Sequence, residues 1–126
     1  MNRRYTTLAA LGLLAASVAL PALAQQQGVT DTELVVGDIL PLTGPPALLG
    51  VAHNLGVKLA VAEANAAGGI NGRKLRLISE DDGYVVSRTI QGVRKMITSD
   101  KIFAFTSLSG TAQGQGALPV VKEAGI

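Results

Sequence analysis

The sequence of 126 residues contains no cysteine and no tryptophan, and its only histidine is His53. Without cysteine the chain forms no disulfide and offers no thiolate to a metal ion. A single histidine is too few for a histidine-built metal centre, and we expect His53 to face solvent from a helix. We therefore expect neither a metal ion nor a cofactor.

Strongly basic segments are also absent. The formal net charge is +2, but two of the eleven basic residues, Arg3 and Arg4, lie in the first 24 residues, which contain no acid. From Gln25 onward the basic and acidic residues balance. Because no lysine- or arginine-rich run alternates with aromatic side chains, we expect no nucleic-acid partner.

The N-terminus follows the plan of a secretory signal peptide. Arg3 and Arg4 precede an apolar block from Leu8 to Leu20, and the small residues Ala22 and Ala24 follow it. A membrane-spanning helix is the alternative, but about 13 apolar residues rising about 1.5 Å each cover roughly 20 Å of a bilayer core about 30 Å thick. We predict a signal peptide over residues 1–24, cleaved after Ala24, and export of residues 25–126.

The exported part alternates between strand and helix patterns. Short apolar runs rich in β-branched residues predict three strands, at Leu34–Leu40, Leu75–Ile78 and Ile102–Phe105. Apolar residues spaced three and four apart predict three helices. The residues that mark them are Ala52, Leu55, Leu59, Ala62 and Ala66 for the first, Val86, Ile90, Val93 and Ile97 for the second, and Leu118 and Val121 for the last.

This alternation predicts an α/β fold, a parallel sheet with helices on both faces. Such sheets bind ligands beyond the carboxyl ends of their strands. We therefore expect the loops 41–50, 80–84 and 107–113 to line one rim. The alternation calls for a fourth strand after Ile126, so we expect this chain to be the first part of an incomplete lobe.

The stretch "SLSGTAQGQG", residues 107–116, follows the third strand. A nucleophilic serine in a G-x-S-x-G turn needs flanking glycines that Ser109 lacks, and no histidine follows Ser109 in the chain. Neither the phosphate-binding G-x-x-x-x-G-K-[ST] pattern nor the dinucleotide-binding G-x-G-x-x-G pattern is present. We expect no enzyme here.

A helix start offers unpaired N–H groups and a partial positive charge, which attract a carboxylate. Gly110 would let a ligand approach the backbone, and the Thr111 hydroxyl would donate one more hydrogen bond. The local sequence equally allows Thr111 to cap its own helix. Because Pro119 would break or kink a helix, we expect the anion-facing piece to be short and a second segment to begin near Leu118.

Three longer stretches resemble the type I periplasmic binding proteins of ABC importers, above all the leucine/isoleucine/valine-binding family. They are "VVGDILPLTGPPALLG", "AVAEANAAGGINGRKLRLISEDDGY" and "FAFTSLSGTAQGQGALPVVKEAGI", and together they cover essentially the whole exported part. The resemblance implies two α/β lobes that close on a small solute, with the N-terminal lobe holding its carboxylate.

Carried over by position, the resemblance places the carboxylate-binding hydroxyl on Thr111, beside Ser109, Gly110 and Ala112. It places a contact to the solute's side chain on Leu49, which could instead pack on its own lobe. Some members join the positions of Tyr84 and Gly110 by a disulfide, which suggests that Tyr84 lies near the pocket. Val85 and Val86 stand where many members have Asp-Pro, so Ser87 is the candidate cap of that helix.

The resemblance implies a periplasmic substrate-binding component that delivers branched-chain or other amino acids, or small carboxylates, to an ABC permease in the inner membrane. The alternative is the ligand-sensing domain of a membrane receptor with the same lobes.

Overall fold

The computed structural model describes residues 26–126. The predicted signal peptide and its cleavage site lie outside these residues.

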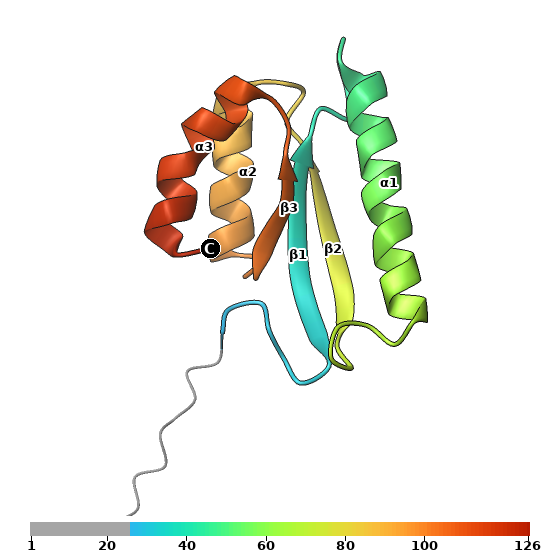
Figure 1. Cartoon of the computed structure of the whole chain (residues 1–126). Helices are drawn as coiled ribbons and strands as arrows, with labels where there is room; N and C mark the ends of the chain where they lie inside the picture. The colour runs from blue at the N-terminus through green and yellow to red at the C-terminus, as the bar shows by residue number, and fades with distance from the viewer. Residues whose placement is uncertain (1–25) are drawn as a thin grey trace, which may run out of the picture.

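The described chain is a parallel three-stranded sheet between two helical layers (Figure 1). Helix α1 covers one face of the sheet, and α2 and α3 lie side by side on the other. The strands lie in the order β2-β1-β3, and β1 pairs in parallel with both neighbours. The predicted α/β class is confirmed. In chain order the elements are β1 Glu33–Leu40, α1 Ala47–Ala66, β2 Lys74–Asp81, α2 Val86–Thr98, β3 Ala104–Leu108 and α3 Thr111–Ala124.

The central strand β1 is buried on both of its faces from Val35 to Leu40. Val35 and Ile39 join Val93 and Met96 of α2 in the main core. On the opposite face, Asp38 meets α1. Burial on both sides explains why β1 is mostly apolar, without the alternation of polar and apolar residues typical of a strand with one exposed face.

The three strands are confirmed, but their bounds differ from the predicted ones: β1 and β2 each begin one residue earlier, and β3 ends at Leu108 rather than Phe105. β2 extends to Asp81, so the acidic residues Glu80 and Asp81 belong to the strand and pair with Ile39 and Leu40. β3 begins two residues later than predicted, at Ala104: the Ile102 amide donates to Met96 O at the end of α2, and the Phe103 amide makes the first bond to β1, at Val35 O. Because β3 ends at Leu108 and α3 begins at Thr111, the third rim loop is only Ser109 and Gly110.

Helix α3 runs without interruption from Thr111 to Ala124, so the predicted break near Leu118 is wrong. Pro119 lies inside the helix and has no N–H to donate to Gln115 O four residues earlier. Because Gln115 and Pro119 are both exposed, water can satisfy that carbonyl and the helix tolerates the proline.

Helix α1 turns its predicted apolar stripe away from the sheet. Leu55 and Leu59 are each 61% exposed, whereas the residues of α1 that are buried are Gly50 and Asn54. Gly50 is required there, since a side chain would place its first carbon 2.1 Å from Pro41 O. Within residues 26–126, α1 alone is long and apolar enough to cross a membrane by length and composition, but here it covers the sheet.

A buried polar contact ties α1 to the sheet. The Asn54 side-chain amide donates to Asp38 Oδ2 at 3.0 Å on β1 and to Ser79 Oγ at 2.8 Å on β2. Asp38 is fully buried, and its other oxygen has no partner among the described residues. Since a buried polar group needs a hydrogen-bond partner, this contact favours the orientation in which the Asn54 side of α1 faces the sheet.

We expect Asn54→Ala to lower the free energy of unfolding by about 2–3 kcal/mol, because it leaves the buried Asp38 side chain without its hydrogen-bond donor. Urea denaturation measures the loss. The matched control is His53→Ala, next to it on the exposed side of α1, which should change stability by less than about 0.5 kcal/mol. Equal effects of the two substitutions would contradict the structural role of Asn54.

Candidate ligand-binding site

Three loops meet at the edge of the sheet where all three strands end (Figure 1). They are residues 41–46 after β1, residues 82–85 after β2, and Ser109 with Gly110 after β3. Parallel pairing alone requires their carboxyl ends to share one edge. We refer to this edge as the rim.

The Asp81 carboxylate joins the first two loops. Its Oδ1 accepts the backbone N–H groups of Leu42 at 2.8 Å, Thr43 at 3.2 Å and Gly83 at 2.9 Å. Its Oδ2 accepts the Thr43 hydroxyl at 2.5 Å and lies 3.9 Å from an Arg88 nitrogen. Four donors on one carboxylate hold both loops to the last residue of β2.

These donors also lower the pKa of Asp81. The Thr43 hydroxyl has the largest effect, and the amides of Gly83, Leu42 and Thr43 add to it, while partial burial opposes them. Hydrogen bonds to the ionised form favour that form, so Asp81 is charged at neutral pH.

Because the folded pKa lies below the ordinary value of 3.8, the ionised carboxylate stabilises the fold above about pH 4 and this contribution disappears as the pH falls through the lowered pKa. We expect wild type to be more stable than Asp81→Asn at neutral pH, with the difference narrowing in acid. Urea unfolding from about pH 7 to about pH 2.5 tests this. A difference independent of pH would contradict it.

Tyr84 occupies the left-handed region, with φ of 66°. Its amide donates to Asp82 Oδ1 at 2.8 Å, and its carbonyl accepts the side-chain amide of Gln113 at 3.0 Å. These two bonds compensate for a backbone conformation that non-glycine residues rarely adopt. A side chain at Gly110 would place its first carbon 2.9 Å from the Tyr84 ring, so Tyr84 and Gly110 are neighbours.

The start of α2 differs from the expected one. Val85 is its N-cap residue and makes no side-chain hydrogen bond, so Ser87 does not act as a cap. Asp82 instead accepts the hydroxyl of the buried Thr89 at 2.6 Å, one turn into the helix. The second rim loop is therefore attached to α2 through Asp82.

The start of α3 leaves its backbone donors free. Gly110 is the N-cap residue with φ of 99°, no side chain caps the helix, and no acid lies in its first turn. Within the part of the chain that the structure describes, the amides of Gly110, Thr111 and Ala112 meet no acceptor. Thr111 is exposed and is the first residue of the helix, so the alternative that it caps α3 is wrong.

Ser109 differs from the three residues after it. Its amide donates to Ile39 O at 3.2 Å, which fastens the third loop to β1 and removes this amide from the free donors. The free donors therefore begin at Gly110. A 14-residue helix also concentrates roughly half a positive charge at these amides, which favours an anion.

Gln113, which sequence reasoning missed, lies beneath this helix start. It is 2% exposed, and while its Nε2 donates to Tyr84 O, its Oε1 has no partner among the described residues. The Oε1 lies 2.1 Å from where a side-chain carbon at Gly110 would be. Gln113 thus joins the second loop to α3 and leaves no room for a side chain at position 110.

We expect Gly110→Ala to destabilise the protein by about 1–3 kcal/mol, because an alanine at this positive φ is strained and meets Gln113 and Tyr84. Gly114, four residues further along α3, provides a matched control, since a side chain there would meet nothing within 4 Å. Gly114→Ala should raise stability by about 0.5–1 kcal/mol. Thermal denaturation of both variants distinguishes them, and a tolerated Gly110→Ala would contradict the close approach.

Leu49 lies in the first turn of α1, directly after the first rim loop. It is 75% exposed, so the alternative that it packs on its own lobe is wrong. No contact joins it to Tyr84 or Gly110 within the described residues. The structure thus groups Tyr84 with residues 109–112 and leaves Leu49 separate at the same edge.

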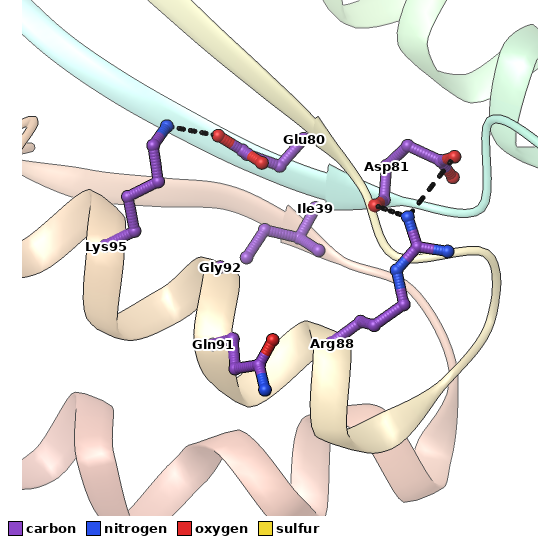
Figure 2. Close-up of a pocket in the computed structure, with 7 residues that line it drawn as sticks. All are labelled: Ile39, Glu80, Asp81, Arg88, Gln91, Gly92 and Lys95. Carbon is purple, nitrogen blue, oxygen red and sulfur yellow. Dashed lines mark hydrogen bonds and ion pairs between the residues drawn. The ribbon is translucent and has the colours of Figure 1, made fainter.

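A charged groove of about 370 Å³ lies below the rim, between β2 and α2. Figure 2 shows Arg88 and Lys95 reaching from α2 towards the end of β2. Lys95 pairs with Glu80 and Asp100, which raise the pKa of Lys95, and Arg88 bonds to Asp81 O. Because its cations are already paired, this groove is a weaker anion site than the start of α3.

The sequence profile of the periplasmic binding proteins matches residues 33–126. The chain belongs to the type I periplasmic binding protein family. This is a family of substrate-binding proteins rather than enzymes, which agrees with the absence of a catalytic motif noted in the sequence.

Individual relatives support the same assignment. A Leu/Ile/Val-binding protein homologue of Brucella abortus (strain 2308) is 39% identical over 80 residues, which are 64% of this chain and 22% of the relative. A periplasmic substrate-binding protein of Ralstonia solanacearum superposes with a TM-score of 0.72 at 34% identity, over 75% of this chain and 27% of that one.

A branched-chain amino acid transporter substrate-binding protein of Streptococcus pneumoniae, solved in complex with isoleucine, superposes with a TM-score of 0.73 at 25% identity, again over 75% of this chain and 27% of the other. The chain thus spans about a quarter of the length of the proteins it matches.

Proposed function

We propose that this protein binds an amino acid or another small carboxylate in the periplasm and delivers it to an ABC permease in the inner membrane. The observation that carries the proposal is the free start of α3, where the amides of Gly110, Thr111 and Ala112 meet no acceptor in the described chain. Uncapped amides at a positive helix end bind a carboxylate without requiring a charged side chain.

Each rim residue has a role in this proposal. The amides of Gly110 and Ala112 and the hydroxyl of Thr111 bind the carboxylate, and Gly110 keeps the approach open because it has no side chain. Tyr84, 49% exposed beside Gly110, forms one wall. Leu49 offers an apolar surface to the rest of the solute, and Ser109 supports the site by holding its loop to β1.

Branched-chain amino acids are the first solutes to test. The Brucella abortus relative is named for leucine, isoleucine and valine, and the Streptococcus pneumoniae protein was solved with isoleucine. The apolar side chains of leucine, isoleucine and valine could pack against the exposed Leu49. Signal-peptide cleavage after Ala24 would release the protein as a soluble periplasmic carrier.

We expect Thr111→Ala in the complete protein to weaken binding of leucine, isoleucine or valine about 10- to 150-fold, since a hydrogen bond to a charged group contributes about 1.5–3 kcal/mol and each 1.4 kcal/mol is about tenfold. Thr111→Ser keeps the hydroxyl and should bind nearly as well as wild type. Isothermal titration calorimetry measures all three proteins.

The matched control is Ser87→Ala, which removes an exposed hydroxyl in the first turn of α2. It should leave the affinity unchanged. Unchanged affinity in Thr111→Ala would remove this hydroxyl from the site. Wild-type protein that binds none of the three amino acids and no small carboxylate would overturn the proposed function.

A further inference from the structure

The first rim loop has few backbone N–H groups that could form hydrogen bonds to fix its position. Residues 41–46 include Pro41, Pro45 and Pro46, which have no N–H, so the loop has amide donors only at Leu42, Thr43 and Gly44. Two of these three amides donate to the same oxygen, Asp81 Oδ1. The Thr43 hydroxyl donates to the other oxygen of that carboxylate.

The carboxylate that collects these donors is itself rigidly placed. Asp81 is the last residue of β2 and pairs with Leu40, the last residue of β1. The next amide, that of Asp82, continues the pairing by donating to Leu40 O at 3.2 Å. Asp81 also accepts the amide of Gly83, so one side chain anchors both loops to the end of the sheet.

The position of this loop determines where α1 begins. Gly44 O accepts the amide of Ala47, the first residue of α1, and Pro46 O accepts the amide of Leu49. Releasing residues 42 and 43 from Asp81 would therefore loosen the start of α1, including Leu49, on the ligand side of the rim.

We propose that Asp81 is a positioning residue of the ligand site, whose carboxylate holds the 41–46 loop and Leu49 in the arrangement that receives the solute. This proposal rests on the function proposed above. Asp81 itself does not contact the solute. It acts by keeping the binding-competent arrangement populated, and a loop that occupies this arrangement only a tenth of the time would weaken the apparent affinity about tenfold.

Two substitutions test this in the complete protein, with leucine, isoleucine and valine as probes. Asp81→Ala removes the acceptor for all four donors, and we expect the affinity to fall about tenfold or more. Thr43→Val removes only the hydroxyl of an exposed residue and should have a smaller effect in the same direction. Thr43→Ser restores the hydroxyl and should restore the affinity.

Amide hydrogen exchange provides a readout independent of binding. We expect the amides of Leu42 and Thr43 to exchange faster in Asp81→Ala than in wild type. The matched control is Glu33→Gln, which removes an exposed carboxylate at the opposite end of the sheet that pairs with Arg76. It should change neither the affinity nor these two exchange rates.

The outcomes separate the two proposals. Wild-type protein that binds no probe overturns the proposed function. If wild type binds, two results would overturn the positioning role. In the first, Asp81→Ala binds as tightly as wild type while the amides of Leu42 and Thr43 exchange faster. In the second, these two amides exchange no faster in Asp81→Ala than in wild type. If Asp81→Ala does not fold, Thr43→Val and its serine rescue decide the question, and equal affinity of Thr43→Val and wild type then overturns the proposal.

Discussion

Parallel pairing of β1 with both of its neighbours is the constraint on which the rest of this structure depends. Strands that run in one direction must be joined by crossovers, and here each crossover is a helix. The same pairing brings the ends of β1, β2 and β3 to one edge. The rim is thus a consequence of strand direction, and its chemistry comes from the few residues placed just after each strand.

Hydrogen bonds between the loops turn three short connections into one surface. Asp81 joins the first loop to the second, Gln113 joins the second to α3, and the Ser109 amide joins the third to β1. Each bond has one partner on a strand or helix: Asp81 on β2, Gln113 on α3 and Ile39 on β1. Short loops anchored in this way lose little further entropy when a solute binds, which favours affinity.

The backbone amides of the first rim loop and those at the start of α3 differ in whether they have acceptors. Two of the three amides of the first loop, those of Leu42 and Thr43, donate to Asp81, whereas the amides at the start of α3 meet no acceptor within the described chain. Unpaired amides are unfavourable unless water or a ligand satisfies them. Hydrogen bonds to Asp81 therefore fix the first loop in place, and the free donors lie at the start of α3, where a carboxylate would bind.

Helix α1 shows how a polar residue can override an apolar pattern. The apolar residues at helical spacing predicted the helix itself, and α1 extends over Ala47–Ala66. They did not predict its orientation, since Leu55 and Leu59 are exposed and Asn54 is buried. Asn54 meets Asp38 and Ser79, which come from two different strands, and only the folded sheet brings those strands together.

The sequence by itself determined the order of strands and helices and the parallel sheet, because these depend on periodicity and on local turn residues; the anion site at Gly110 and Thr111 stays a prediction. The uninterrupted α3 and the roles of Asp81 and Gln113 were decided by the tertiary structure. Gln113 reads as one polar residue among several in a glycine-rich stretch, and Asp81 reads as part of an acidic turn. Their partners lie 29 and 39 residues away, at Tyr84 and Leu42, and no local pattern specifies a hydrogen bond between segments that only folding brings into contact.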